Sequence, residues 1–411
     1  MSKIKPFKAI RPTRDKVYLV ASRPYYAYKK KVLDIKLETN PYTFLHVINP
    51  ERDLVEMMNI NKIERHQKSR EKLEEFIEQG VFIEDKEDTF YLYRQSSENK
   101  SFIGLIAGAS IEEYRSGKIR KHEETITSRE EHFKDYLKIV ECNAEPVLLF
   151  HSHHEDLYQL LNSLAENRPE YEFSTTEKIK HEVWLIQDKP LIDRIQSYYE
   201  EIDRIYIADG HHRCASSDRL SQERNARPES TQNFFMAYFI SEKNLEIIEY
   251  NRLVKDLNGL SVKEFFEQIE KNYRVELMSN PIKKVTEKHC LMMYLDHQWY
   301  LLSVKEGVFD ENDPVAQLDT AILTQTILAP ILGISDLKTD DRIEFIQGSK
   351  GLKGVVKKVD AAEFRVGFVL HPVSVSQLKN VADNQRIMPP KSTWIEPKLR
   401  SGLTMYPIYY D

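Results

Sequence analysis

The segment from Ile205 to Arg213 constrains this chain more than any other. It reads Ile-Tyr-Ile-Ala-Asp-Gly-His-His-Arg, so a run of strand-forming residues ends in an Asp-Gly pair. The residues from 214 to 220 are small or compatible with a helix. The pattern therefore predicts a strand, a tight turn and the first turn of a helix.

A helix that begins directly after such a turn favours an anion at its N-terminus. The first backbone N–H groups of a helix have no intrahelical acceptor, and the helix dipole is positive at this end. Phosphate is a natural occupant of this position, with Arg213 as a planar fork and His211 and His212 as donors or proton carriers. The alternative is a helix capped by Asp209 with solvated histidines. Two histidines and an arginine in a row favour the anion site.

The Asp209–Arg213 segment resembles the phosphate-handling box of the ParB/sulfiredoxin-like superfamily, which includes sulfiredoxins, ParB-type nucleotidases and free serine kinases. The chain as a whole resembles one branch of it, the uncharacterised family DUF1015. This resemblance implies a nucleotide-binding core, although a fold does not settle a reaction. The stretches that carry it are Phe7–Pro12, Asn40–His46, His122–Thr125, Asp209–Arg213 and Pro389–Thr393.

Length and composition limit the class of protein. At 411 residues, with 41% hydrophobic and 30% charged residues, the chain is typical of a soluble protein with two domains. A net charge of −6 indicates neither nucleic-acid nor membrane binding, and no apolar stretch reaches the length of a membrane span. Three scattered cysteines and no leader-like N-terminus suit a reducing cytoplasm. The oligomeric state is not indicated.

The pattern of helices and strands predicts an α+β fold. We expect mixed sheets with interleaved helices: a ParB/sulfiredoxin-like nucleotide core over residues 1–250, and a second α+β domain over residues 251–411 that contributes to the same cleft. The predicted helices are 52–79, 127–137, 190–202, 265–273 and 316–332. The predicted strands are 17–21, 89–94, 101–109, 146–151, 183–186, 233–240, 290–295 and 298–304.

A second candidate segment is Lys118–Thr125, which contains His122 and Glu123. Its composition alone is typical of an exposed charged loop. Because a His-Glu-x-Thr element recurs at this point of the family, the resemblance favours a functional role. It implies Glu123 as general base, with His122 and Thr125 contacting the substrate.

The segment from Met388 to Lys398 is the third candidate. Lys391, Ser392 and Thr393 offer one cation and two hydroxyls in a row, as a phosphate or carboxylate site requires. The glycines of a Walker loop are absent, so a proline-stiffened surface loop is the alternative. The resemblance raises these residues to substrate-binding candidates that meet the Asp209 turn in one cleft.

Three further segments complete the candidates. By the superfamily resemblance, Arg11 contributes to the wall of the nucleotide cleft. The loop Arg23–Tyr26 departs from the family pattern Pro-Pro-Tyr-Asp, with Arg23 for the first Pro and Tyr26 for the Asp. The segment His151–Glu155 has metal-ligand residue types, but a solvated strand end is the favoured interpretation.

Four functions follow as hypotheses, one leading and three alternative. The leading one is phosphoryl transfer between an adenine nucleotide, ATP or ADP, and a small hydroxy amino acid such as serine, in either direction and with Mg²⁺. In it His211 and His212 polarise the phosphates, Asp209 and Gly210 shape the turn, and Glu123 is the base. A phosphoserine phosphatase on the same scaffold, a sulfiredoxin-like reductase using Cys214 and a non-catalytic ParB-like nucleotide switch are the alternatives.

Overall fold

The computed structural model describes residues 3–24, 27–48, 61–225, 227–279 and 284–409. By their internal contacts these residues form two compact units. The first contains residues 1–245 and 397–411, and the second contains residues 246–396. Each unit has its own sheet and its own core.

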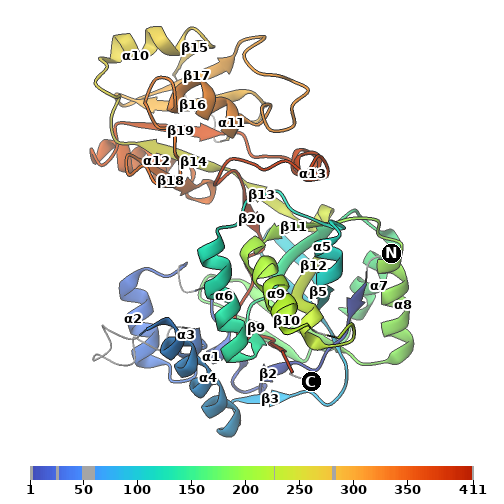
Figure 1. Ribbon diagram of the computed structural model, residues 1–411. Helices are drawn as coiled ribbons and strands as arrows, with labels where there is room; N and C mark the ends of the chain where they lie inside the picture. Colours follow the sequence, from blue (N-terminus) through green and yellow to red (C-terminus); the bar gives the residue numbers. More distant parts are fainter. Residues whose placement is uncertain (1–2, 25–26, 49–60, 226, 280–283, 410–411) are drawn as a thin grey trace. The chain divides into compact units, whose positions relative to one another are not determined.

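The first unit is built on a mixed sheet of nine strands among the described residues (Figure 1). Its order is β6-β11-β8-β12-β5-β4-β10-β9, with β1 paired to β5. Neighbours β6 and β11 are parallel, as are β8 and β12, and the other pairs are antiparallel. The strands are β1 (Ile4–Lys5), β4 (Phe90–Ser97), β5 (Lys100–Ser110), β6 (Ile119–Arg120), β8 (Val147–His151), β9 (Tyr171–Ser174), β10 (Lys180–Ile186), β11 (Ile205–Asp209) and β12 (Phe234–Ser241).

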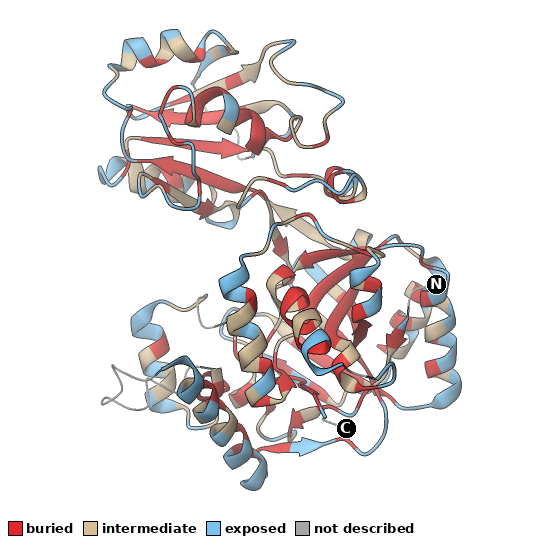
Figure 2. Cartoon of the chain, in the orientation of Figure 1, coloured by how far each residue is buried: buried red, intermediate tan, exposed pale blue. Residues whose placement is uncertain are grey.

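The two faces of this sheet differ because strand side chains alternate. On one face Leu92, Leu105 and Phe239 join a large apolar core with side chains of α7 (Glu155–Leu164) and α8 (Lys189–Glu200). The other face presents tyrosines, such as the buried Tyr93 and Tyr238, together with polar groups. Both faces are buried, as the red strands of Figure 2 show.

Short strands and helices complete the first unit. The helices α6 and α9 pack on each other, as do α4 and α6. The remaining helices are α1 (Val17–Val20), α2 (Lys30–Thr39), α3 (Leu45–Ile48), α4 (Lys62–Glu78), α5 (Ile111–Arg115), α6 (Thr127–Val140) and α9 (His211–Arg224). The remaining strands are β2 (Ile10–Pro12) with β3 (Phe82–Glu84), and β7 (Cys142–Asn143) with β21 (Tyr406–Pro407).

The second unit has a six-stranded antiparallel sheet of order β15-β17-β16-β19-β14-β18 and a two-stranded ribbon, β13 (Glu246–Ile248) with β20 (Trp394–Glu396). The large sheet has an apolar core on each face. Its strands are β14 (Tyr250–Val254), β15 (Tyr273–Met278), β16 (Cys290–Leu295), β17 (Gln298–Val304), β18 (Ile343–Gln347) and β19 (Val366–Leu370). Its helices are α10 (Val262–Ile269), α11 (Asp319–Leu323), α12 (Gly351–Asp360) and α13 (Val375–Asp383).

This division of the chain differs from the predicted one at the C-terminus. The prediction assigned all of residues 251–411 to the second domain, whereas residues 397–411 lie in the first unit. The physical reason is backbone pairing, because β21 pairs with β7 and Ser401 forms a bridge with Ser22. The last residues therefore belong to the unit that contains the Asp209 turn.

The α+β fold with mixed sheets and interleaved helices is confirmed. The predicted strands 290–295 and 298–304 are confirmed as β16 and β17, which pair as a hairpin. Its turn residues Asp296 and His297 both have a positive φ. The predicted strand 17–21 was wrong, because Val17–Val20 form a helical turn with Val17 and Val20 buried. The predicted helix 316–332 is shorter, since α11 continues only as a π-helical turn over Thr324–Leu328. Residues 52–60 of the predicted helix 52–79 lie outside the described residues.

No described helix combines the length and the apolar character that crossing a bilayer requires.

Candidate functional site

The candidate site lies where two parallel strands end. Strands β6 and β11 pair in parallel, with Ile205 opposite Ile119 and Tyr206 opposite Arg120. Their carboxyl ends therefore meet at one edge of the sheet, the edge at which α/β proteins commonly bind ligands. The loop that contains His122 follows β6, and the Asp209 turn follows β11. The structure thus brings together two segments that the sequence identified separately.

The turn after β11 starts α9 without a side-chain cap in the part of the chain that the structure describes. Gly210 has φ +105° and is the N-cap residue, and no side chain of the described residues caps the helix. The Gly210 carbonyl accepts from the N–H groups of Arg213 (2.9 Å) and Cys214 (3.1 Å), which begins the helix. The predicted strand, turn and helix are confirmed here. The predicted cap by Asp209, which was the alternative, is not made.

Arg213 folds back over the turn. Its Nη1 donates to the carbonyl of Pro146 (2.7 Å) and lies 3.7 Å from Glu145, while Nη2 lies 3.8 Å from Asp209. A Cβ on Gly210 would lie 3.0–3.2 Å from three atoms of the guanidinium. The glycine is therefore required twice, for its positive φ and for this close approach.

Asp209 receives a second cation from the C-terminal segment. The Nζ atom of Lys398 lies 3.4 Å from its Oδ2, and the Asp209 side chain is 41% exposed. Burial alone would raise the pKa of Asp209, but the charges of Lys398 and Arg213 hold it below its ordinary value. The turn therefore carries an ionised carboxylate between two cations at the positive end of a helix.

The loop after β6 joins the turn through two histidines. The rings of His122 and His211 meet edge to face, with centroids 4.6 Å apart. The His122 N–H donates to Nε2 of His211 (3.4 Å), and Nδ1 of His211 lies 3.5 Å from Glu123. This arrangement places the His211 proton on Nδ1, facing the Glu123 carboxylate.

Both histidines are uncharged at neutral pH. His122 is fully buried and His211 is 4% exposed, and burial lowers the pKa of each to about 3. Neither ring nitrogen of His122 has a hydrogen-bond partner among the residues that the structure describes. Because His211 is buried and its Nδ1 lies next to Glu123, it orients this carboxylate, whose side chain is 45% exposed. His212 is the next residue of the first helical turn and is only partly buried.

The remaining residues of this loop fix it to the helices. Thr125 donates to Glu130 of α6, and Glu130 also accepts from Arg219 of α9 (2.6 Å). The Thr125 hydroxyl is therefore engaged within the protein. Its predicted contact with the substrate stays a prediction.

Cys214 lies inside the core. It is fully buried within the large apolar cluster, and burial raises the pKa of its thiol. A thiolate is the nucleophile that a sulfiredoxin-like reaction needs. The geometry and the raised pKa both argue against Cys214 in that role.

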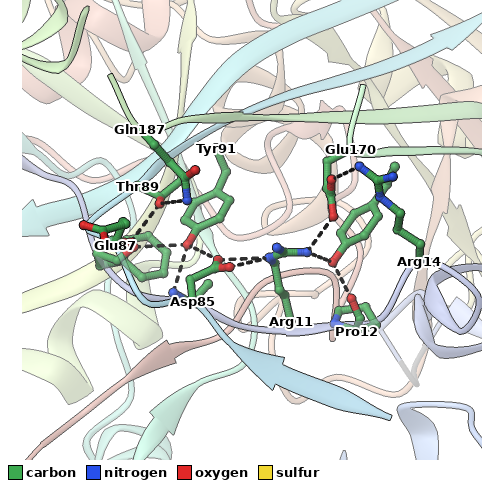
Figure 3. Close-up of polar contacts among 12 residues, drawn as sticks. Arg11, Pro12, Arg14, Asp85, Glu87, Thr89, Tyr91, Glu170 and Gln187 are labelled. Atoms are coloured by element: carbon green, nitrogen blue, oxygen red, sulfur yellow. Dashed lines mark hydrogen bonds and ion pairs between the residues drawn. The ribbon is translucent and has the colours of Figure 1, made fainter. Parts of the chain in front are cut away.

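Arg11 has structural partners (Figure 3). Its Nε lies 2.9 Å from both oxygens of Asp85, and its Nη1 donates to Glu170 and Tyr171. The side chain is 7% exposed. An arginine so buried and paired ties β2 to the sheet, and this is our interpretation of Arg11 in place of the predicted cleft wall. Tyr26 of the adjacent predicted loop lies outside the described residues.

The predicted substrate residues Lys391, Ser392 and Thr393 lie in the second unit. The Ser392 hydroxyl bonds to Thr320 (3.0 Å) and to the Pro389 carbonyl (2.7 Å), and the buried Arg252 donates to the Lys391 carbonyl (3.1 Å). The loop is therefore firmly held within its own unit. Their predicted contact with the substrate stays a prediction.

The histidines at the end of β8 contact other residues of the first unit. His151 is buried against Tyr199, so the expectation that it is solvated was wrong. His153 bonds to Ser241 (3.0 Å) and Glu155 (2.9 Å). Within the described residues, no three His, Cys, Asp or Glu side chains are arranged to hold a metal.

Sequence reasoning missed two residues of the site. Lys398 ends the predicted Met388–Lys398 segment, but the cation chosen there was Lys391. Glu145 lies beside Arg213 and accepts a hydrogen bond from Ser401. The register of β8 against β11 places Glu145 at this edge, and no signal in the sequence shows that pairing.

A family model described as "Protein of unknown function (DUF1015)" matches residues 4–321. No curated protein matches the chain. Among solved structures, SbnI with a C-terminal truncation, from Staphylococcus aureus, is 10% identical, with 71% of this chain and 82% of that chain covered and a TM-score of 0.38. A free serine kinase in complex with AMP is 12% identical, with 74% and 90% covered and a TM-score of 0.36. At these values the likeness says nothing of what this chain binds.

Proposed function

The chain belongs to the DUF1015 family, and we propose that it transfers a phosphoryl group between an adenine nucleotide and a small hydroxy amino acid. One observation carries the proposal. The N-terminus of α9, with Arg213 and Lys398 beside it, faces the loop that holds Glu123. Phosphate binding and a carboxylate base are therefore adjacent, as phosphoryl transfer requires.

The phosphate end of the nucleotide would bind at the turn. The first N–H groups of a helix have no intrahelical acceptor, and Arg213 offers a planar fork at this end of α9. The two flanking cations neutralise charge that develops on the transferred group. Phosphoryl transfer depends mainly on such positioning and neutralisation.

Glu123 is the proposed base. It is half exposed, so it can reach a substrate hydroxyl, and its contact with the buried, neutral His211 holds it in place. A carboxylate in this position accepts the hydroxyl proton as the phosphoryl group arrives. His211 is therefore a positioning residue in this proposal, and His212 contacts the phosphates.

The carboxylates of the site fit a divalent cation that arrives with the nucleotide. Mg²⁺ keeps several waters and binds through one or two carboxylates and the phosphates. The described residues form no cage of three ligands, but Asp209 and Glu123 supply two carboxylates at the turn. The cation would neutralise the phosphates, and Asp209 is the residue that we expect to hold it.

Phosphorus NMR with Mg²⁺ tests this proposal. One sample holds ATP and L-serine, and the other holds ADP and O-phospho-L-serine. We expect phosphate to move between nucleotide and serine in at least one sample, and this signal to be lost in Arg213→Gln. Free phosphate from phosphoserine would instead indicate a phosphatase. Nucleotide binding without turnover would contradict the transfer and favour a ParB-like nucleotide switch.

A further inference from the structure

The large sheet carries a second polar cluster, on strands β4 and β10. Gln95 and His181 lie directly opposite each other in the antiparallel register, so their side chains share one face. Gln95 is 4% exposed and His181 is fully buried. The Nε2 atom of each has no hydrogen-bond partner among the described residues. Two buried polar atoms without partners are costly to leave so, and they point to a missing ligand.

The ring of His181 is uncharged and fixed. Its Nδ1 bonds to the Tyr93 hydroxyl (2.8 Å), and the ring stacks between Tyr93 and Phe173. Burial, with a smaller effect from the charge of Arg400, lowers the pKa of His181 to about 3. When the Tyr93 hydroxyl donates to Nδ1, Nε2 carries the proton and is a donor without an acceptor.

Arg400 brings a buried cation to the turn of the hairpin whose strand β10 carries His181. Its side chain is 6% exposed, and Nη2 lies 3.2 Å from Glu177. Glu177 also pairs with Arg23 and is 41% exposed. Glu177 lies in the turn between β9 and β10, outside both strands. Glu177 therefore joins Arg23 to the buried Arg400, and the charge of Arg400 acts on the His181 ring.

This cluster is close to the phosphate site along the chain. Lys398 contacts Asp209, and Arg400, only two residues later, contacts Glu177. Two residues of extended chain span about 7 Å. The α9 turn and the Arg400 cluster are therefore linked by one short, well-anchored stretch.

We propose that Arg400, with Gln95 and His181, binds the α-carboxylate of the amino-acid substrate, and that Glu177 holds this position until the substrate replaces it. The inference rests on the proposed function. The guanidinium fork and the two neutral donors match the two oxygens of a carboxylate, and Glu177 shows that a carboxylate fits Arg400. A preference for a carboxylate over an uncharged substituent follows from burial of the cation.

Titration calorimetry with a matched pair of ligands tests the assignment. O-phospho-L-serine and O-phosphoethanolamine both carry a phosphate and an ammonium, and only the first has a carboxylate. We expect the protein to prefer phosphoserine by about tenfold or more. Arg400→Gln should abolish the preference and leave the affinity for phosphoethanolamine unchanged. A preference that survives in Arg400→Gln would overturn the inference and make Arg400 structural.

A second variant keeps the test decisive if Arg400→Gln does not fold. Glu177→Gln removes the competing charge at a half-exposed position, so we expect tighter binding of phosphoserine and unchanged binding of phosphoethanolamine. Glu172→Gln is the control, since Glu172 lies in the same hairpin and pairs with Lys180 at the surface. Unchanged or weaker phosphoserine binding in Glu177→Gln would overturn the inference.

A parallel titration with ADP separates this inference from the proposed function. ADP binding without any preference for phosphoserine overturns the carboxylate site and leaves the nucleotide site standing. If the wild-type protein binds none of ADP, phosphoserine and phosphoethanolamine, the proposed function is overturned, and this inference fails with it.

Discussion

The ammonium of Lys398 lies 3.4 Å from the carboxylate of Asp209, although 189 residues separate them in the chain. The contact joins the C-terminal segment to the turn that begins α9. It also places a second cation beside Arg213 at the positive end of a helix. The end of the chain is therefore part of the proposed phosphate site.

Replacing Lys398 tests this role. We expect Lys398→Gln to weaken ADP binding by about tenfold, because one of two cations next to the phosphates is lost. Titration calorimetry at fixed ionic strength measures the effect. Lys189→Gln is the control, since Lys189 is 75% exposed on α8 and pairs there with Asp193. Equal affinities in the two variants would contradict the role of Lys398.

Gly210→Ala should damage both stability and binding. The positive φ costs a non-glycine residue about 1–3 kcal/mol, and the new Cβ pushes Arg213 away from the turn. Gly80→Ala is the matched control, because Gly80 also has a positive φ (+70°) but no atom within 4 Å of a Cβ. We expect both variants to unfold at a lower urea concentration than the wild type, and only Gly210→Ala to lose ADP affinity. Full ADP affinity in Gly210→Ala would show that the position of Arg213 is unimportant.

Glu123→Gln separates chemistry from binding. Loss of a general base lowers the rate by about 10²–10⁴-fold, while the nucleotide affinity should stay within a factor of three or so. The neighbouring Glu124→Gln, at an exposed position, should keep the wild-type rate. Single-turnover transfer of radiolabelled phosphate measures both variants. A normal rate in Glu123→Gln would remove Glu123 as the base.

The unfolding free energy of the first unit should begin to fall at a higher pH than protonation of its carboxylates alone would cause. Burial holds five histidines uncharged, with pKa values of about 3 or 4; they are His66, His122, His151, His181 and His211. Each binds a proton near pH 6.5 only in the unfolded chain, so their contribution is complete above that pH and is lost as the pH falls below it.

The expected loss is up to about 2 kcal/mol per histidine between pH 7 and pH 5. Urea unfolding at constant ionic strength measures it. His151→Gln, outside the phosphate site, should reduce the slope of the unfolding free energy against pH near pH 5 by about 1.4 kcal/mol per unit. An unchanged slope would mean that His151 is protonated in the folded protein.

The segment around the site was predictable because its signal is local. An apolar run, an Asp-Gly pair and a helix-compatible stretch specify β11, the turn and α9 within 20 residues. The hairpin at Asp296 and His297 was predictable for the same reason, since these two polar residues separate two stretches of strand length that are rich in apolar residues.

The rest depends on pairing that no local pattern contains. The pairing of β21 with β7 places the C-terminal segment in the first unit. The cation beside Asp209 is therefore Lys398, which lies seven residues after Lys391, the cation chosen from the sequence. For Arg11, the residue type and the surroundings favour different roles. Its residue type suits phosphate, but burial beside Asp85 and Glu170 directs it to a structural ion pair.

A crystal structure of the protein with ADP and Mg²⁺ tests the central claim most directly. We expect the β-phosphate oxygens to accept hydrogen bonds from the N–H groups of His211 and His212, within reach of Arg213 and Lys398. Phosphates bound elsewhere in the protein, with the α9 turn unaltered, would contradict the account.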